Sequence, residues 1–278
     1  MTCHTAKFER LKYWGIEMKK LLLALTAAAA FSGSALAADL PARTYTKAPP
    51  PIVAPSWTGF YIFGGVAGGV YDADTFTSVT ATGVPLSIHQ RMGGDGWLGT
   101  VGAGYDWQVN HSWVAGVFGD GMFGSLKGSI QDPFAGFTAN IKMQDSWAAG
   151  VRVGYLVAPN VLSYVNGGYS GSHWSGTTLF STFSGLPVGE HTNSFNRNGW
   201  FVGGGVENNL DIFGISAPGW FMKTEYRAAY YDKKAINELF DGSNALVGRD
   251  INFKPWVETI STSLVYRFNW TGPVVAKY

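Results

Sequence analysis

The sequence predicts an all-β fold, an eight-stranded antiparallel up-and-down β-barrel that crosses a membrane with its strands. Three observations lead to this prediction. Segments of about ten residues alternate between apolar and polar side chains, the connections between them are alternately short and long, and tryptophans occur at the segment ends. From Trp57 onward no apolar run is long enough for a transmembrane helix, so a membrane-spanning body must be built from strands.

Alternation with a period of two identifies the strands. In 97–109, for example, Trp97 and Val101 share one face while Asp106 lies on the other. Alternation is poor in the first and fifth segments and does not assign their faces. The eight predicted strands are 57–71, 97–109, 112–126, 147–157, 161–174, 200–209, 220–231 and 256–270.

The connections differ in length on the two sides of the predicted barrel. Asn110-His111 and Pro159-Asn160 are tight turns, and 210–219 is a short connection. Short turns on one side and long loops on the other are typical of an outer-membrane barrel whose long loops lie outside the cell. An even number of strands then places both ends of the chain on the periplasmic side. The connections predicted to be long polar loops are 72–96, 127–146, 175–199 and 232–255.

Tryptophans at the strand ends predict two aromatic girdles, one at each membrane–water interface. The alternative is a soluble barrel with an aromatic core. Its large apolar residues would point inward, yet the face opposite them here carries glycine, alanine, threonine and a few charges, which suits the narrow interior of a membrane barrel. The girdle beside the short turns contains Trp57, Trp107, Trp113, Trp220 and Trp270, and the girdle beside the long loops contains Trp97, Trp147, Trp174, Trp200 and Trp256.

The beginning of the chain has the features of an export signal. Met18-Lys19-Lys20 is a basic start, an apolar stretch of 21–31 follows, and Ala35-Leu36-Ala37 is a small-residue cleavage site. Residues 18–37 are therefore predicted to be a Sec-type signal peptide that is cleaved after Ala37. The preceding residues 1–17 match no targeting element, and we interpret them as a non-native N-terminal extension.

Cleavage changes the composition and divides the remaining chain into two parts. It removes Cys3, the single cysteine, together with five of the 20 basic and two of the 19 acidic residues, which leaves 15 basic against 17 acidic. This balance provides no basic surface for nucleic acid. Five prolines make 38–56 an extended periplasmic linker, and 57–278 is the predicted barrel.

Several motifs carry a family resemblance. The mature start Ala38-Asp39-Leu40-Pro41, the proline-rich lead, Trp57-Thr58-Gly59-Phe60-Tyr61 and the closing Leu264-Val265-Tyr266-Arg267-Phe268 resemble those of the OmpA-like barrels. More narrowly, they resemble the small porin-like surface antigens of alphaproteobacterial outer membranes. The resemblance implies an envelope protein that supports membrane integrity and surface interactions, or a small diffusion porin. Its implied partners are outer-membrane lipids, the barrel assembly machinery, periplasmic chaperones and an extracellular partner of the loops.

Motifs for catalysis, cofactors or metals are weak. Gly119 to Gly124 match G-x-G-x-x-G, but they lie inside a predicted strand and open no helix, so a dinucleotide site is not predicted. The histidines have no metal-ligand spacing. Glu190-His191 invites comparison with lipid-modifying barrel enzymes, yet no matching serine arrangement accompanies it. We therefore predict no enzyme activity, no cofactor and no metal.

Charged residues on the inward faces are the candidate functional residues. Lys223, Glu225 and Arg227 are two positions apart on one strand and should point the same way, toward charges on the other strands. A charge buried in a narrow interior must be paired, so these residues form either a salt-bridged plug or a narrow polar pathway for water and ions. The predicted interior network is Asp106, Asp120, Arg152, Glu207, Lys223, Glu225, Arg227, Glu258 and Arg267.

Overall fold

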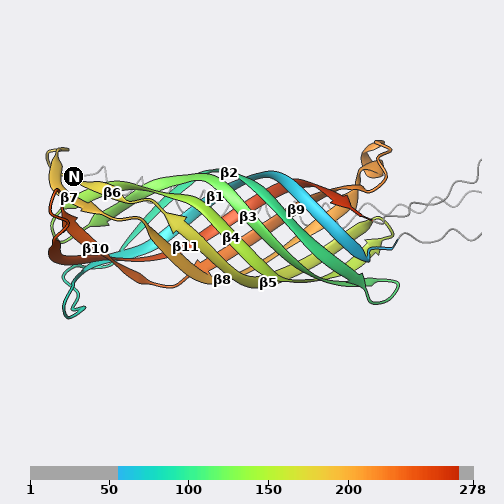
Figure 1. Ribbon diagram of the computed structural model, residues 1–278, viewed down its shortest axis with the longest axis horizontal. Coiled ribbons are helices and arrows are strands. Elements are labelled where there is room, and N and C mark those ends of the chain that lie inside the picture. The colour runs from blue at the N-terminus through green and yellow to red at the C-terminus, as the bar shows by residue number, and fades with distance from the viewer. Residues whose placement is uncertain (1–55, 269–278) are drawn as a thin grey trace, which may run out of the picture. The chain divides into compact units, whose positions relative to one another are not determined.

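The computed structural model describes residues 56–268, which form a single closed β-barrel (Figure 1). The one helical segment in this range is a short 3₁₀ turn, η1 (Leu210–Phe213). No helix in this range is long and apolar enough to cross a membrane. The strands are β1 (Gly59–Val79), β2 (Gln90–Gln108), β3 (Trp113–Asp132), β4 (Phe137–Ala158), β5 (Val161–Trp174), β6 (Thr177–Ser181), β7 (Pro187–Thr192), β8 (Phe195–Asn209), β9 (Trp220–Tyr231), β10 (Lys234–Phe240) and β11 (Leu246–Arg267).

Eight strands close the main ring, as the sequence predicts. Its order is β1-β2-β3-β4-β5-β8-β9-β11, and β11 pairs back with β1 in an antiparallel register that includes Tyr61 with Arg267. Both ends of the described chain lie at the same end of this ring as the turns 109–112, 159–160 and 210–219, and we call it the terminal end (Figure 1). The opposite end carries the four hairpin tips, and we call it the hairpin end.

The strands continue well beyond the predicted boundaries toward the hairpin end. β1, β4 and β11 contain 21, 22 and 22 residues, although about 9–11 suffice to cross a membrane. The segments 72–96, 127–146, 175–199 and 232–255 are therefore mostly strand, and the prediction of long polar loops there was wrong. Near the hairpin end, the short strands β6, β7 and β10 take the places of β5, β8 and β9, with pairings β4–β6, β6–β7, β7–β10 and β10–β11.

The kind of side chain that faces outward changes along the barrel. This change explains why the predicted strand ends were wrong. Between the girdles the outward residues are apolar, such as Val101 and Val151, which are 55% and 58% exposed. Toward the hairpin end the outward residues become polar or charged, and apolar residues such as Ile130 and Ile251 point inward and are fully buried. The same strand thus follows the membrane pattern in one half and the soluble-barrel pattern in the other. A single alternation pattern therefore extends only to the point of reversal, and the predicted strands end there.

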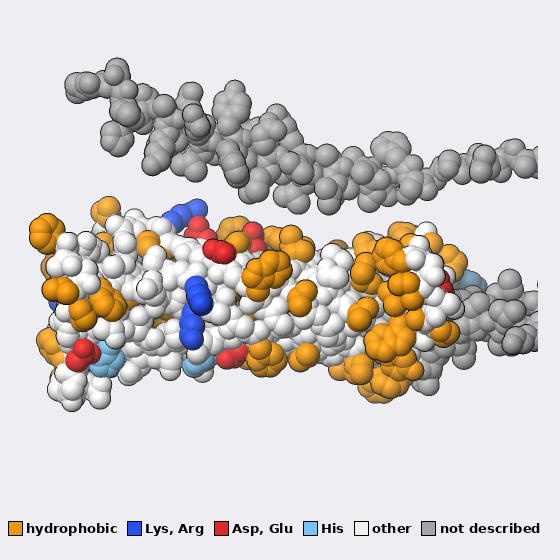
Figure 2. All heavy atoms as spheres, turned by 90° about the horizontal axis from the view of Figure 1, so that it is seen from above, with side chains coloured by type: hydrophobic (Ala, Val, Ile, Leu, Met, Phe, Trp, Pro, Cys, Tyr) orange, Lys and Arg blue, Asp and Glu red, His pale blue; other side chains and the backbone are white. Residues whose placement is uncertain are grey.

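Two bands of aromatic side chains surround the outside of the barrel. On β2, Trp97 and Trp107 face outward ten positions apart, a span that fits one membrane crossing. Trp200 stacks on Tyr230 with ring centroids 4.5 Å apart, and Tyr230 stacks on Trp256 at 5.1 Å. On the face shown in Figure 2, hydrophobic side chains gather toward the terminal end, and most charged side chains lie nearer the hairpin end. The exposed tryptophans are Trp97, Trp107, Trp113, Trp147, Trp200, Trp220 and Trp256.

Three predicted girdle residues are placed differently. Trp57 and Trp174 are 1% and 0% exposed and point into the barrel, so their assignment to the girdles was wrong. Trp57 lies two residues before β1, and Trp174 is the last residue of β5. Both belong to the two segments whose faces the sequence does not assign. The indole Nε1 of Trp57 donates to the carbonyl of Pro159 at 3.1 Å, which satisfies its one polar atom inside the barrel. Trp270 lies outside the described residues.

Candidate functional site

Four of the predicted interior charges form a closed ring near the terminal end, which we call the basal ring: Asp106, Arg152, Glu207 and Arg267. Arg152 Nε donates to Asp106 Oδ1 at 2.9 Å, and its Nη1 donates to Glu207 Oε2 at 3.0 Å. Arg267 Nε donates to Glu207 Oε1 and its Nη2 to Asp106 Oδ2, both at 2.7 Å. Each carboxylate therefore binds both guanidinium groups, and the buried ring carries no net charge.

Four more predicted charges form a second group, the central cluster: Asp120, Lys223, Glu225 and Arg227. Arg227 Nη1 donates to Asp120 Oδ1 at 2.9 Å, and its Nη2 donates to Glu225 Oε1 at 2.8 Å. Lys223 Nζ lies 3.7 Å from Glu225 Oε2, which also accepts a hydrogen bond from the Tyr164 hydroxyl at 2.8 Å. The cluster is also neutral and buried. Its three β9 residues share the inward face of the strand because they are two positions apart.

Aromatic rings line both groups of charges. The guanidinium carbon of Arg152 lies 4.4 Å from the ring centroid of Tyr61, and that of Arg267 lies 4.4 Å from the ring centroid of Trp57. Lys223 Nζ is 3.4 Å from the ring centroid of Phe63. Cations in an environment with little water gain from such ring faces, so the aromatic side chains help to stabilise the buried charges.

The structure contradicts one member of the predicted interior network. Glu258 lies half-buried on the outer wall of β11, next to Tyr226. Glu258 and Arg267 are nine positions apart on one continuous strand, so they must point to opposite faces. The prediction that they belong to one network was therefore wrong.

An apolar layer lies between the central cluster and the hairpin end. Trp174 packs against Tyr71 and against Phe253, both with ring centroids 5.0 Å apart, and Phe253 packs against Phe195 at 5.7 Å. All four rings are buried. They belong to a continuous core that also contains aliphatic side chains from four strands, namely Leu98, Leu126, Ile130, Ile141, Met143 and Ile251.

A third charged group near the hairpin end, the distal cluster, consists of Asp132, Glu190, Glu238 and Arg249. Arg249 Nε donates to Asp132 Oδ2 and to Glu238 Oε2, both at 3.1 Å, and its Nη2 donates to Glu190 Oε2 at 2.8 Å. Asp132 also accepts a hydrogen bond from the Thr77 hydroxyl. Three carboxylates thus share one guanidinium, unlike the balanced groups nearer the terminal end.

The excess of acids in the distal cluster affects their protonation. Burial, reinforced by the neighbouring Asp132, raises the pKa of Glu238 to about 8. Glu238 is fully buried, and its Oε1 has no hydrogen-bond partner among the described residues. Burial also raises the pKa of Glu190, against the opposing effect of Arg249.

Sequence reasoning missed the distal cluster because its residues lie in the segments predicted to be loops. The spacing of buried residues within these segments nevertheless indicates short strands. Ile236 and Glu238 are two positions apart, as are Glu190 and Thr192, and all four side chains are buried. A period-two search that allowed apolar residues to point inward would have found these short strands.

The motifs with catalytic or metal-binding associations have structural roles in the described part of the chain. Gly119 to Gly124 lie within β3, where Asp120 binds Arg227. His89 pairs with Asp74 and His191 pairs with Asp241, at exposed positions of the barrel. Within residues 56–268, no three side chains of the metal-ligating types come together.

A closed eight-stranded ring with apolar outward faces, bounded by aromatic bands, defines a membrane β-barrel. The sequence matches the outer membrane protein beta-barrel domain over residues 23–268, so the chain belongs to this family and lies in the outer membrane. It is 30% identical over 263 residues to the 31 kDa outer-membrane immunogenic proteins of Brucella melitensis and Brucella suis, covering 90% of this chain and 100% of each relative. The resemblance to small outer-membrane surface antigens is thus confirmed.

Solved structures include barrels similar to this chain. OprG from Pseudomonas aeruginosa is 11% identical, covering 78% of this chain and 100% of OprG with a TM-score of 0.48. Neisserial surface protein A is 15% identical, covering 76% of this chain and 98% of that protein with a TM-score of 0.37.

Proposed function

We propose that this protein is a closed structural barrel that supports the outer membrane and presents its hairpin end to the outside of the cell, without enzyme activity. The observation that carries the proposal is the filling of the barrel interior. The basal ring and the central cluster fill the interior with paired charges, and the apolar layer around Trp174 follows toward the hairpin end. A side-chain core of this kind supports mechanical anchoring in the bilayer more than diffusion through it.

The second candidate function is a small diffusion porin, and the polar half of the interior is the observation in its favour. Water and ions passing that half would still meet buried apolar rings such as Trp174 and Phe253. Moving an ion from water into an apolar environment costs many kcal/mol unless it is paired, so this layer opposes conduction.

Single-channel recording tests the closed barrel. Purified protein in planar bilayers should be silent, or show rare and brief openings, because the apolar layer excludes ions. Stable, large conductance in the wild type would contradict the closed barrel and establish the porin function. A variant with Trp174→Ala and Phe253→Ala is the matched comparison, since it removes two rings from the layer, and its openings should become more frequent than those of the wild type.

We propose that the terminal end faces the periplasm, where the barrel assembly machinery and chaperones would receive the chain, and that the hairpin end meets outside partners. Large apolar side chains are exposed on three of the hairpin tips, and they support a role in surface interactions because contact with a partner would remove them from water. Phe183 is 99% exposed, Ile88 76%, Leu186 64% and Phe134 56%.

Cysteine labelling on intact cells tests this orientation. Cys3, the single cysteine of the sequence, precedes the predicted cleavage site, so the wild type measures the background. Phe183→Cys at a hairpin tip should react with a membrane-impermeant maleimide in intact cells. Ile212→Cys, at an exposed position in the turn of the terminal end, should react only after the outer membrane is permeabilised. The reverse labelling pattern would refute the orientation.

A further inference from the structure

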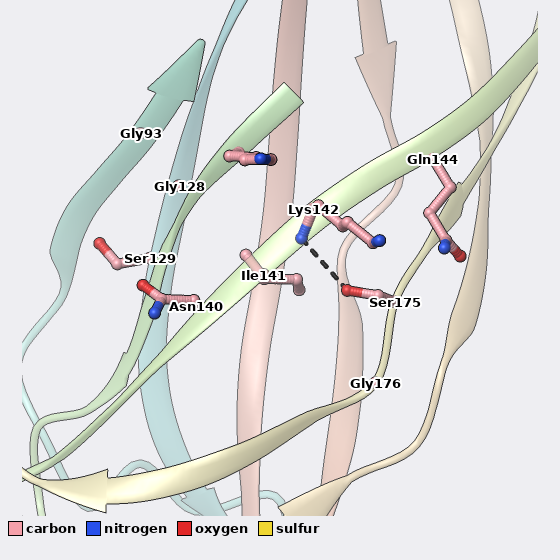
Figure 3. A pocket seen from close by; sticks show the side chains of 10 residues that line it. Gly93, Gly128, Ser129, Asn140, Ile141, Lys142, Gln144, Ser175 and Gly176 are labelled. Carbon is pink, nitrogen blue, oxygen red and sulfur yellow. Dashed lines mark hydrogen bonds between the residues drawn. The ribbon is translucent and has the colours of Figure 1, made fainter. Parts of the chain in front are cut away.

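A polar groove on the outer wall of the barrel has no role in the proposed closed core. Its volume is about 910 Å³, and it extends over β2, β3, β4 and the connection from β5 to β6 (Figure 3). The groove exists because β4 pairs with β5 only as far as Met143 and resumes with β6 at Thr138. Between these points two hydrogen bonds link the sides: Lys142 N donates to Ser175 Oγ at 3.3 Å, and Ser175 N donates to the Lys142 carbonyl at 3.0 Å.

The lining of the groove contains two lysines and no acidic residue. Lys127 on β3 and Lys142 on β4 are direct cross-strand partners, an arrangement that destabilises a sheet when both residues have the same charge. Neither lysine forms an ion pair with another residue of the range 56–268. Asp95 on β2 is the other cross-strand partner of Lys127 and lies outside the groove lining. One acid therefore faces the two lysines, and the pair keeps a net positive charge.

The other polar side chains of the groove supply hydrogen-bond donors. Ser129, Asn140, Gln144 and Ser175 all line it, and their hydroxyl or amide groups can donate. Figure 3 shows Lys142 and Ser175 on opposite sides of the gap, with Gln144 further along β4. A site with two ammonium groups, several neutral donors and no carboxylate suits a compact anion such as a phosphate group.

The position of the groove along the barrel indicates where this phosphate comes from. Lys127 is opposite Asp95, and Asp95 is two residues from the girdle residue Trp97 on the same strand. Two residues of a strand span about 7 Å, so the lysines lie just beyond the aromatic band. Lipid head-groups occupy this level of a membrane, whereas the hydrocarbon lies on the other side of the girdle.

A second groove on the outer wall provides an internal comparison. It is lined by Asp72, Asp74, Arg91 and Lys254, and Asp74 is the cross-strand partner of both basic residues. Acids and bases are balanced there, so this groove does not require an external anion. The lysine pair of the first groove is therefore not a general feature of the wall at this level.

We propose that the groove around Lys127 and Lys142 binds the phosphate group of a phosphorylated lipid in the outer leaflet. The assignment to the outer leaflet rests on the orientation proposed above, whereas binding of the lipid phosphate does not. The bound phosphate neutralises the two opposed lysines, so the lipid should stabilise this side of the barrel. The groove would thereby attach the barrel to the charged surface of its own membrane.

Lipid binding to the purified protein in detergent tests this proposal independently of orientation. The probes are lipid A with both phosphates, dephosphorylated lipid A and inorganic phosphate, with bound lipid counted by native mass spectrometry. The wild type should prefer the phosphorylated lipid by roughly tenfold or more, and Lys127→Gln with Lys142→Gln should abolish the preference. The matched control, Arg91→Gln with Lys254→Gln, should retain it.

Thermal unfolding provides a second measurement. Without lipid, Lys142→Gln alone should unfold at the same or a higher temperature than the wild type, because it relieves the repulsion between the lysines. With phosphorylated lipid, the wild type should gain more stability than this variant. Equal affinity for the two forms of lipid A, an unchanged preference in the double lysine variant, or displacement of the lipid by equimolar inorganic phosphate would overturn the proposal.

Discussion

Replacement of Arg152 by alanine should lower the free energy of unfolding by about 3–5 kcal/mol. Arg152 donates to both Asp106 and Glu207, which are completely buried. Without it, Arg267 alone faces two carboxylates, and one negative charge stays unpaired in the interior. Urea unfolding in lipid vesicles, followed by tryptophan fluorescence, measures the loss.

Two comparison variants separate the pairing of Arg152 from its packing. Arg152→Ala combined with Glu207→Gln restores the charge balance, so the double variant should be more stable than Arg152→Ala alone. Arg197→Ala removes an arginine that is not buried in the core and should change stability by about 0–1 kcal/mol. If the effects of Arg152→Ala and Glu207→Gln simply add, and each is below about 1 kcal/mol, the basal ring does not hold the barrel together.

Glu238→Gln should make the barrel more stable at pH 9 and leave it nearly unchanged at pH 4. In the wild type, the pKa of Glu238 rises from its ordinary value of 4.5 to about 8. The folded state therefore retains a proton that the unfolded chain has already lost, and this contribution to stability is complete below pH 4.5. It declines as the pH rises and is gone above about 8, a difference of up to about 5 kcal/mol.

Glutamine stays neutral at every pH, so the variant should lack this decline. Urea unfolding at intervals from pH 4 to pH 9, with hydrogen exchange of the β10 amides, checks the prediction. Asp232→Asn is the matched control, because Asp232 is an exposed acid just before β10 that forms no ion pair within residues 56–268, and it should retain the wild-type pH profile. Parallel profiles for the wild type and Glu238→Gln would show that Glu238 carries no proton in the folded state.

The face of each inward charge could be predicted because side chains alternate between the two faces of a strand. This alternation can be followed without knowing which strands lie next to it. Lys223, Glu225 and Arg227 must share a face, and their companions Arg152 and Glu207 follow from the same rule. Which of them bind each other could not be predicted. The structure separates the basal ring from the central cluster, whereas the sequence predicted a single network. Height inside a barrel depends on strand stagger, which parity does not reveal.

The distal cluster and the outer groove show a second limit. Asp132 and Arg249 are 117 positions apart, and Lys127 faces Lys142 through a hairpin whose tip was predicted to be loop. Both sites belong to the part of the barrel beyond the hairpin-side girdle. There the membrane no longer requires an apolar outer face, so the alternation on which the prediction relied is reversed.

The sequence alone determined that this protein is an eight-stranded outer-membrane barrel, because lipid on one side and a narrow interior on the other impose a period-two pattern on each membrane-crossing segment. The tertiary structure alone decided where the strands end, which charges pair, and that Trp57 and Trp174 fill the interior instead of facing lipid. These features depend on strand register and on breaks such as 175–176, which bring distant residues to the same height. Local alternation fixes the face of a side chain, but closure of the ring fixes its neighbours.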